Sequence, residues 1–444
     1  MKLATFRGGV HPEEGKELSR HSPIVDFVPE SETMVYPLAQ HIGAPAVPVV
    51  KVKDRVLVGQ CIGAAQGFVS ANVLSSVSGT VKAITPHLTA SGAMVQSIVI
   101  TNDFLYEKVE GFGTERDWTK LSREEKLDLI KAAGIVGMGG AAFPTHVKLS
   151  PKDPSAIDTV IVNGAECEPY LTSDERVMLE EPEKVVGGLQ IILSLFPNAK
   201  GVIGIESNKP EAIEKLKELT KDLSSISVCP LKTKYPQGGE RTLIYAVTGR
   251  KINYQMLPAD VGCIVDNIDT VVSIYQAVAK GTPLLRRIVT VTGDAIASPV
   301  NFRVPTGVLY KDLVEKAGGF QKNPVKLLSG GPMMGQALFS LEVPVTKNSS
   351  ALTCLSKDEA AEKKVSPCIR CGRCALVCPG HILPNLAVRY AEKGDLEMFE
   401  KVDGLECCEC GCCSYICPAG RPLTQLMKQA RKDTLALKRQ KGGK

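Results

Sequence analysis

The chain of 444 residues is long enough for about three domains of ordinary size. Hydrophobic residues make up 44% of the chain and charged residues 23%, a balance typical of a globular protein in water. Aromatic residues contribute only 5%, which argues against a stacking platform for single-stranded nucleic acid. The net charge of +5 is modest and does not by itself imply a nucleic-acid partner, so we expect none.

The first 20 residues contain no apolar core before a small-residue cleavage site, so we expect no signal peptide. No run approaches the roughly 18 apolar residues that a membrane-spanning helix needs. Of the 15 cysteines, eight fit a spacing that occurs twice near the C-terminus and is described below, and such thiolates survive in reducing compartments. We therefore expect a cytoplasmic protein, or one that docks on the cytoplasmic side of a membrane.

Residues 1–110 are predicted to form a polar N-terminal segment and a β-sandwich. Four short valine- and glycine-rich runs are the predicted strands: 47–52, 55–58, 79–84 and 96–100. The phrase VLVGQCIG followed by VSGTV resembles a biotinyl/lipoyl-type domain. Carriers of that family have a lysine at the hairpin tip, where this chain has residues 68–72 and no lysine. We expect the shape of that domain without its carrier function.

Residues 111–283 are predicted to form an α/β domain that begins with a helix over 124–133. A glycine-rich run with Gly137, Gly139 and Gly140 follows this helix. Backbone N–H groups in such a run can approach phosphate oxygens, because no Cβ atom is in the way. A helix precedes the run rather than a strand, so by itself the run fits an ordinary turn equally well.

Residues 158–162 are a predicted buried strand with polar residues at its end. Asn163, Glu166 and Glu168 follow the strand directly. Amide and carboxylate groups at a strand end, beside a phosphate-cradling loop, suit a nucleotide. Asp174 and Glu175, taken alone, fit a solvated acidic turn.

Residues 284–350 are predicted to form a small β-grasp domain. Strands over 287–293 and 301–305, followed by a helix over 307–317, give a β-β-α order. The later glycine turn over 330–335 is expected to be structural, with Met333 and Met334 packing against a neighbour rather than binding a metal.

Residues 351–424 carry two runs of the pattern C-x2-C-x2-C-x3-C-P. This pattern is typical of proteins with two [4Fe–4S] clusters, in which the fourth cysteine of each run binds the other cluster. The predicted ligands of the first cluster are Cys368, Cys371, Cys374 and Cys417. The predicted ligands of the second cluster are Cys407, Cys410, Cys413 and Cys378. Zinc and a disulfide framework are the competing readings.

Two helices are predicted between the cysteine runs, over 386–393 and 396–402, and this arrangement resembles helical dicluster ferredoxins. The tail over 425–444 contains seven Lys and Arg residues against one Asp. Such a tail is either a solvent-exposed helix end or a basic segment that contacts anionic lipid or an acidic partner.

Four motifs of the α/β domain resemble the flavin- and NADH-binding subunit of respiratory complex I and related hydrogenases: GMGGAAFPTHVK, NGAECEP, GGERTL and DNIDT. The resemblance implies bound FMN with NAD(H) stacked on it. It implies that Gly137, Gly139, Gly140 and Lys148 hold the phosphate and ribityl side. It further assigns Asn163, Glu166, Asn267 and Thr270 to the flavin, and Phe143, Glu168 and Glu240 to the nicotinamide nucleotide. The chain departs from that pattern at Ala142, Ala165 and Gly239.

The order of all these parts resembles the RnfC family of ion-translocating Rnf (ferredoxin:NAD oxidoreductase) complexes. This resemblance implies an oxidoreductase subunit that passes electrons between NAD(H), FMN and two [4Fe–4S] clusters, because a flavin links two-electron to one-electron carriers. It implies membrane subunits as partners, ferredoxin reached through another subunit, Na⁺ or H⁺ transport by those partners, and a peripheral place on the cytoplasmic face of the membrane. The alternatives are a cobalamin reductase-like flavin/Fe–S protein of a bacterial microcompartment and a non-catalytic scaffold that carries clusters.

Overall fold

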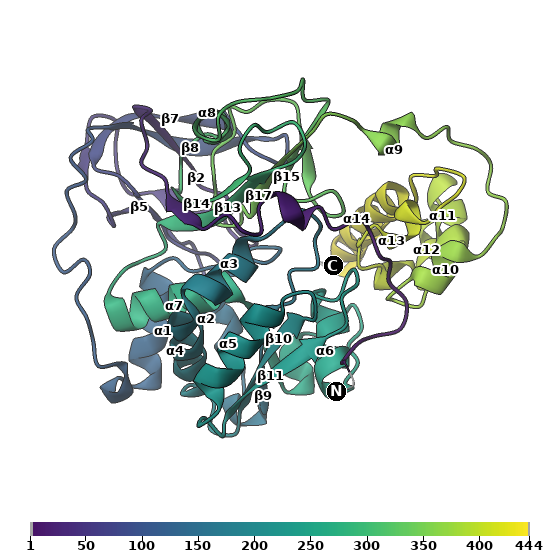
Figure 1. Ribbon diagram of the computed structural model, residues 1–444, viewed down its shortest axis with the longest axis horizontal. Coiled ribbons are helices and arrows are strands. Elements are labelled where there is room, and N and C mark those ends of the chain that lie inside the picture. Colours follow the sequence, from purple (N-terminus) through teal and green to yellow (C-terminus); the bar gives the residue numbers. More distant parts are fainter. Residues whose placement is uncertain (1–2, 443–444) are drawn as a thin grey trace.

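The computed structural model describes residues 3–442. An N-terminal β-sandwich and a six-stranded sheet lie next to each other above a central α/β domain, and a small helical domain lies to one side (Figure 1). Among the described residues, no helix has both the length and the apolar character needed to cross a membrane.

The β-sandwich consists of two antiparallel sheets, with strand orders β2-β8-β7-β4 and β3-β5-β6. The strands are β2 (Thr33–Pro37), β3 (Val47–Pro48), β4 (Arg55–Val56), β5 (Cys61–Ala64), β6 (Val73–Leu74), β7 (Gly79–Leu88) and β8 (Met94–Asn102). All four predicted strands are present, although β3 and β4 are shorter than predicted. The predictions missed β2, β5 and β6.

The α/β domain is built on a parallel sheet of order β11-β10-β9-β12. Its strands are β9 (Thr159–Gly164), β10 (Lys200–Glu206), β11 (Ile226–Leu231) and β12 (Cys263–Asn267). Its helices are α1 (Arg123–Ala132), α2 (Thr145–Lys148), α3 (Ser173–Glu180), α4 (Pro182–Leu193), α5 (Pro210–Thr220), α6 (Glu240–Thr248) and α7 (Ile268–Lys280), with short 3₁₀ turns η2 (Trp118–Lys120), η3 (Pro154–Ala156) and η4 (Pro258–Val261).

Local sequence explains where the helices of this domain begin. Ser122 and Glu125 form a capping box before α1: the Glu125 N–H donates to Ser122 Oγ at 3.1 Å, and the Ser122 N–H donates to Glu125 Oε2 at 2.7 Å. Asn267 caps α7 by accepting from the Asp269 N–H at 2.9 Å. Both caps satisfy N–H groups that lack a partner inside the helix.

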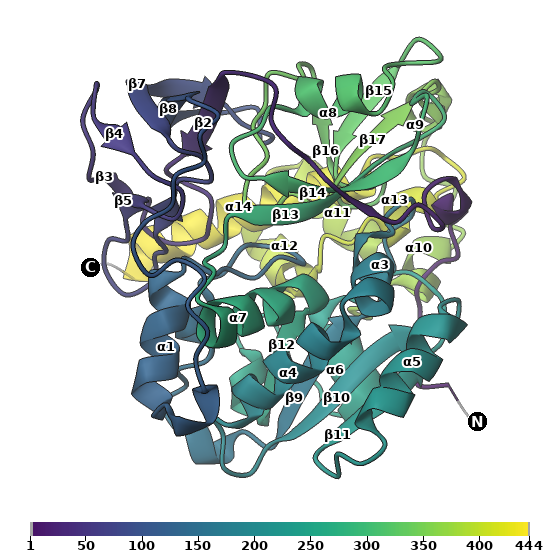
Figure 2. The ribbon, with the colours of Figure 1, turned by 60° about the vertical axis from the view of Figure 1, so that its left-hand side comes forward.

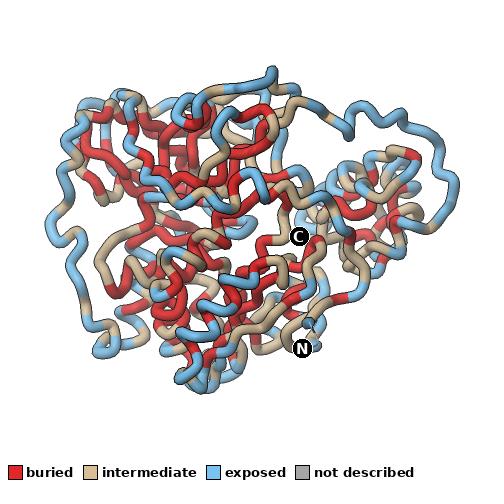
Figure 3. Tube along the Cα trace, viewed as in Figure 1, coloured by how far each residue is buried: buried red, intermediate tan, exposed pale blue. Residues whose placement is uncertain are grey.

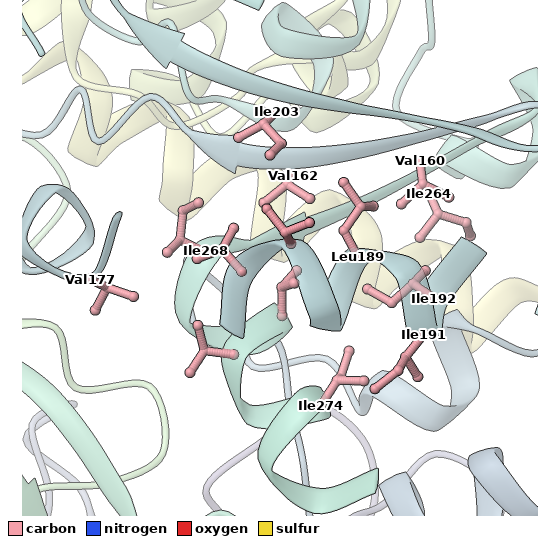
Figure 4. Close-up of a cluster of buried hydrophobic side chains, with 14 of the residues drawn as sticks. Val160, Val162, Val177, Leu189, Ile191, Ile192, Ile203, Ile264, Ile268 and Ile274 are labelled. Carbon is pink, nitrogen blue, oxygen red and sulfur yellow. The ribbon is translucent and has the colours of Figure 1, made fainter. Parts of the chain in front are cut away.

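The core of the α/β domain lies between the sheet and helices α4 and α7. Strand residues Val160 and Val162 lie near Leu189 of α4, and Ile274 of α7 lies near Ile191 of the same helix (Figure 4); all five side chains are fully buried. Burial of each such side chain is worth about 1.5–3 kcal/mol. This core fixes the ends of β9 and β12, from which the site described below projects.

The six-stranded sheet has the order β1-β14-β13-β17-β15-β16. Its elements are β1 (Ile24–Asp26), β13 (Arg286–Thr292), β14 (Val300–Pro305), α8 (Tyr310–Lys316), β15 (Lys326–Ser329), β16 (Gln336–Leu338) and β17 (Ala351–Leu355). The predicted β-β-α order is present. Because β17 pairs with β13 and β15, the sheet continues past residue 350, where the sequence placed the next domain. Met34 and Ile98 of the sandwich share one hydrophobic cluster with Val289 of this sheet.

The helical domain, here called the cysteine domain, spans residues 359–442. It contains α9 (Glu359–Glu362), α10 (Arg373–Val377), α11 (Pro384–Glu392), α12 (Leu396–Lys401), η5 (Gly404–Glu406), α13 (Cys412–Tyr415) and α14 (Leu423–Gly442). Helices α11 and α12 confirm the two predicted between the cysteine runs. Fully buried Val388, Phe399 and Met427 form its core.

Residues 3–23, here called the N-terminal strap, include η1 (Lys16–Leu18) and lie apart from the sandwich that follows them (Figure 2). The strap contacts three parts of the molecule. Ala4 pairs with Leu231 of the α/β domain, the Gly9 N–H donates to the Val377 carbonyl of the cysteine domain at 2.8 Å, and the Ser19 carbonyl accepts from Asn301 Nδ2 of β14, in the six-stranded sheet, at 3.0 Å. Several strap residues are buried in these contacts (Figure 3).

Candidate functional site

The carboxyl ends of β9 and β12 bring two of the predicted residues next to each other. Asn163 and Asn267 are register partners at the ends of these neighbouring parallel strands. β10 and β11 lie on one side of β9 and β12 on the other, so the strand order changes direction here. Ligands of open α/β sheets bind at such a switch point, outside the carboxyl ends of the strands.

The glycine loop lies against this edge of the sheet. The Met138 N–H donates to Thr270 Oγ1 at 3.0 Å, and a Cβ on Gly139 would lie 2.9 Å from Asn267 Cβ. A side chain at position 139 would therefore push the loop away from α7. Within residues 3–442, the N–H groups of Gly139 and Gly140 have no bonded partner, and both glycines are exposed. These free donors and the missing Cβ atoms suit a phosphate-bearing ligand.

Lys148, at the end of α2, supplies a positive charge beside this loop. Its Nζ lies 3.0 Å from Asp266 Oδ1 and donates to the Val265 carbonyl at 2.7 Å. A Cβ on Gly137 would lie 3.8 Å from the same Nζ. Burial raises the pKa of Asp266, and Lys148 opposes that shift. Asp266 Oδ2 has no partner among the described residues, so this polar corner suits a further polar ligand group.

Glu166 is buried and organises the start of α3. Its carboxylate accepts from the N–H groups of Asp174, at 2.6 Å, and Glu175, at 3.3 Å, and Lys16 Nζ of the strap lies 3.9 Å from it. Burial raises the pKa of Glu166 to about 7. Its φ of +47° lies in the left-handed region, where a non-glycine residue costs about 1–3 kcal/mol and often marks a functional site.

Asp174 links Glu166 to the edge of the sheet. Its Oδ2 accepts from Asn267 Nδ2 at 2.7 Å, and Glu175 is buried. The reading of Asp174 and Glu175 as a solvated acidic turn is therefore wrong. Asn163 is also fixed, because its Nδ2 donates to the Gly238 carbonyl at 2.8 Å.

Glu168 connects the α/β domain to the six-stranded sheet. Its Oε1 accepts from the N–H groups of Met333, at 2.7 Å, and Met334, at 3.1 Å. The side chain packs so closely against Gly331 that a Cβ there would lie 2.5 Å from Oε1. Burial raises the pKa of Glu168 to about 7, and the two N–H donors oppose the shift. The carboxylate thus holds the 330–335 turn against the α/β domain.

The structure places Phe143 and Glu240 at the borders of this region. The Phe143 carbonyl accepts from the Gly137 N–H at 2.8 Å and closes the glycine loop, while Glu240 is the exposed first residue of α6. Within the described chain, no side-chain hydrogen bond or ion pair joins either residue to the other predicted ones. Their assignment to the nicotinamide nucleotide stays a prediction.

Two cavities in the cysteine domain divide the eight predicted cysteines between them. Cys378, Cys407, Cys410 and Cys413 line a cavity of about 340 Å³, here called the inner cavity. Cys368, Cys371, Cys374 and Cys417 line a second, of about 430 Å³, here called the outer cavity. Each cavity thus receives three cysteines from one run and one from the other. The inner cavity is also lined by Cys408 and Cys412, which lie outside the repeated spacing.

The spacing of these thiols differs from that of a single-ion site. Nowhere in residues 3–442 do three or more His, Cys, Asp or Glu side chains come together closely enough to hold one metal ion. A structural zinc ion would need four ligands within about 2.3 Å of one point. Thiolates that each bind a different iron of a cluster are spread more widely than the ligands of a single ion.

The inner cavity lies beside the α/β domain. Tyr235 and Val10 are buried in one apolar cluster with Cys412, and Cys410 packs against it. Arg241, the second residue of α6, forms an ion pair of 2.9 Å with Glu406, which precedes Cys407. Lys16, Tyr235 and Arg241 also belong to this region and were not among the predicted site residues. Their contacts join segments more than 150 residues apart, and no local spacing signals them.

Family comparisons match three parts of the chain. Residues 130–276 match the Nuo51 FMN-binding domain, residues 4–105 the RnfC barrel sandwich hybrid domain, and residues 288–337 the SLBB domain. Two solved structures of an NAD⁺-reducing [NiFe]-hydrogenase share the fold at 19% sequence identity. For the air-oxidized form the TM-score is 0.50, and the match covers 66% of this chain and 55% of the hydrogenase chain. For the H2-reduced form the TM-score is 0.51, and the match covers 72% of this chain and 63% of the hydrogenase chain.

Full-length relatives are more similar. The C component of the proton-translocating ferredoxin:NAD(+) oxidoreductase complex of Clostridium ljungdahlii is 47% identical over 86% of this chain and 84% of its own length. The C component of the Na(+)-translocating ferredoxin:NAD(+) oxidoreductase complex of Acetobacterium woodii is 41% identical over 99% of both chains. The C component of the ion-translocating oxidoreductase complex of Rhodobacter capsulatus is 40% identical over 96% of this chain. The chain therefore belongs to the RnfC family, the C components of ion-translocating ferredoxin:NAD(+) oxidoreductase complexes.

Proposed function

We propose that this protein is the peripheral electron-transfer subunit of an ion-translocating ferredoxin:NAD⁺ oxidoreductase complex. It binds FMN and NAD(H) at the edge of the α/β sheet and two [4Fe–4S] clusters in the inner and outer cavities. The observation that carries the proposal is the division of eight cysteines into two cavities, each with three thiols from one run and one from the other. That division is the ligand pattern of two-cluster ferredoxins.

The FMN site is proposed at the switch point of the sheet. The free N–H groups of Gly139 and Gly140 and the ammonium of Lys148 would hold the phosphate, while Asn163, Asn267 and Thr270 border the ring and ribityl side. Glu166 positions the Asp174 carboxylate that fixes Asn267. Phe143, Glu168 and Glu240 are proposed to border the nicotinamide nucleotide, with Glu168 acting through the 330–335 turn.

Bound FMN would supply the conversion between hydride transfer and single-electron transfer, which neither NAD(H) nor an iron–sulfur cluster performs alone. The chain itself contributes positioning. Arg241 and Glu406 hold the α/β domain against the inner cavity, and the strap packs between Tyr235 and Val377. The inner cavity is therefore the proposed neighbour of the flavin, and the outer cavity is the proposed exchange point with the rest of the complex.

The names of the relatives support the proposed partners and a place on a membrane-associated complex. Their names describe proton- and Na⁺-translocating complexes that act on ferredoxin and NAD⁺. We propose that membrane subunits of such a complex carry this protein on the cytoplasmic face, reach ferredoxin and perform the ion transport.

Cysteine variants test the cluster assignment. After anaerobic reconstitution, wild-type protein should hold about eight irons and one FMN. Cys378→Ala should lose the cluster of the inner cavity, and Cys417→Ala the cluster of the outer cavity, each leaving about four irons. Cys408→Ala is the matched control and should keep both clusters. Loss of the same cluster in both variants would contradict the cross-run ligand sets, and wild-type protein without FMN would contradict the proposed function.

A further inference from the structure

Tyr235 is buried where four parts of the molecule meet. It lies between β11 and α6 of the α/β domain, and its main chain pairs with Val10 of the N-terminal strap through hydrogen bonds of 2.8 and 2.9 Å. Its side chain belongs to one apolar cluster with Cys412 of the cysteine domain and Met333 of the 330–335 turn. Tyr235 is only 2% exposed, so its ring lies inside this junction.

The hydroxyl of Tyr235 is a buried donor that has no hydrogen-bond partner within residues 3–442. Such groups are rare in folded proteins, and a redox role or a bound group is among their explanations. Two other buried tyrosines of this chain do have partners. Tyr36 Oη lies 2.9 Å from Ser76 Oγ, and Tyr310 Oη lies 2.9 Å from Ser329 Oγ. The unpaired hydroxyl of Tyr235 therefore calls for a local explanation.

The polar side chains that act on this hydroxyl are one carboxylate and three thiols. Burial raises the pKa of Tyr235, and four acidic groups raise it further, because each would repel a phenolate. These groups are the Glu168 carboxylate and the thiols of Cys167, Cys410 and Cys412. The apolar cluster also contains side chains without a strong hydrogen-bond acceptor, namely those of Val10, Met333, Val377 and Ile416.

Three of the four acidic groups already have backbone partners. Glu168 Oε1 accepts from two N–H groups of the 330–335 turn. Cys167 Sγ accepts from a backbone N–H at 3.2 Å, and Cys412 Sγ donates to a carbonyl oxygen at 3.9 Å. Cys410 lines the inner cavity, and its thiol is hydrogen-bonded to that of Cys412. As an iron ligand Cys410 would be a thiolate, which has no proton to donate and accepts hydrogen bonds.

We propose that the Tyr235 hydroxyl donates a hydrogen bond to the sulfur of Cys410 and thereby raises the reduction potential of the inner cluster. This inference rests on the proposed function, because it concerns the cluster proposed for the inner cavity. One added electron makes that cluster more negative, so the hydrogen bond is stronger in the reduced state and favours it. Hydrogen bonds to the sulfurs are among the features that set cluster potentials. The proton stays on the Tyr235 oxygen, and no covalent bond changes.

The test compares wild-type protein with Tyr235→Phe, both as the full chain loaded with FMN and both clusters. The substitution removes one oxygen atom and keeps the ring that fills the junction, so about eight irons should be retained. The cluster potentials are measured by anaerobic redox titration with EPR detection. Tyr310→Phe is the matched control, because it removes a buried hydroxyl that is bonded to Ser329 and Ser349 and lines neither cavity.

The proposal predicts that one potential falls in Tyr235→Phe and that the other stays at its wild-type value. Loss of one hydrogen bond should lower the equilibrium constant for reduction about tenfold, which is about 59 mV for one electron. The Cys417→Ala background, which should keep only the inner cluster, should show the shift. The Cys378→Ala background, which should keep only the outer cluster, should not. Both potentials of Tyr310→Phe should equal those of wild type.

A second measurement detects the hydrogen bond itself. Proteins reconstituted in H2O and in D2O are reduced, and the couplings of exchangeable protons to the inner cluster are compared by ENDOR spectroscopy. Wild-type protein should show one exchangeable proton coupling that Tyr235→Phe lacks. Identical proton couplings, an unchanged or higher inner-cluster potential, or an equal shift of both clusters would overturn the proposal.

Failure of this inference differs from failure of the proposed function. Iron content and bleaching of the flavin by NADH are measured on the same wild-type preparation. Wild-type protein with about eight irons and a bleached flavin, together with an inner-cluster potential that Tyr235→Phe leaves unchanged, would contradict the hydrogen bond alone. Wild-type protein without a cluster in the inner cavity would contradict both.

Discussion

Arg241 Nη1 lies 2.9 Å from Glu406 Oε2, and this ion pair joins the first turn of α6 to the residue before Cys407. The Tyr254 N–H donates to the same carboxylate at 3.1 Å. The Glu406 carboxylate therefore connects the α/β domain, which carries the proposed flavin site, to the inner cavity. The distance between the proposed flavin site and the proposed cluster site of the inner cavity thus depends on a contact that is only partly buried.

Replacing Arg241 should slow electron transfer to the clusters while changing the free energy of unfolding only slightly. Arg241→Gln removes the ion pair, which is partly exposed and so worth less than about 1 kcal/mol. We expect NADH to reduce the flavin as in wild type, while reduction of the clusters, followed by stopped-flow spectroscopy, becomes slower. Arg250→Gln is the matched control, because it breaks the ion pair with Asp158 inside the α/β domain. Cluster reduction at the wild-type rate in Arg241→Gln would count against this role.

Gly9 of the strap should tolerate no side chain. Its φ is +83°, and a Cβ there would lie 2.6 Å from the Tyr235 carbonyl oxygen. Gly9→Ala should therefore lower the thermal midpoint and speed iron loss, because the strap also bonds to Val377, next to Cys378. Gly67→Ala has a similar φ of +75° but open space around it, so it should cost only the backbone penalty of about 1–2 kcal/mol. Equal midpoints for the two variants would show that the Tyr235 contact is unimportant.

These contacts mark the limit of what the sequence could predict. The helix at α1, the strand at β9 and the two cysteine runs were predictable, because capping residues, apolar runs and ligand spacing are local features. The burial of Lys16 was not, because its partners Glu168 and Leu171 lie more than 150 residues away and belong to another part of the fold. Likewise, Glu168 suggested a ligand contact by its place after a strand, whereas in the fold it also holds Met333 and Met334.

Lys148 should contribute both to the stability of the fold and to FMN binding. Lys148→Met leaves the fully buried Asp266 carboxylate without its cation, which should cost about 3–5 kcal/mol. The double variant Lys148→Met/Asp266→Asn removes both charges and should recover most of that stability. Its FMN affinity should stay about tenfold or more below wild type, since one charge-assisted hydrogen bond to phosphate is lost. Wild-type FMN affinity in the double variant, measured by fluorescence titration, would rule Lys148 out as a phosphate ligand.

Glu168 should make stability depend on pH. Burial raises its folded pKa to about 7 from 4.5, so the folded protein holds this proton more tightly than the unfolded chain does. Stability should therefore fall as pH rises from about 4.5 to about 7, and stay level above that range as far as this group is concerned. Glu168→Gln keeps an oxygen for the N–H groups of Met333 and Met334 but removes the titration. Its urea midpoints should change less with pH than those of wild type.

Glu168→Ala completes the comparison. It loses both hydrogen bonds to the 330–335 turn, so it should be less stable than Glu168→Gln across the range and should slow flavin reduction by NADH while keeping its iron. An unchanged pH dependence in Glu168→Gln would mean that another group titrates in this window. Unchanged NADH kinetics in Glu168→Ala would contradict the place of Glu168 beside the nicotinamide nucleotide.

An anaerobic NADH titration of the reconstituted full-length protein tests the central claim most directly, with optical and EPR spectra recorded at each step. The account predicts that NADH bleaches the flavin absorption and that the iron–sulfur signals of a preparation with about eight irons change in the same titration. A flavin that NADH does not bleach, or a protein that holds only about four irons, would contradict it.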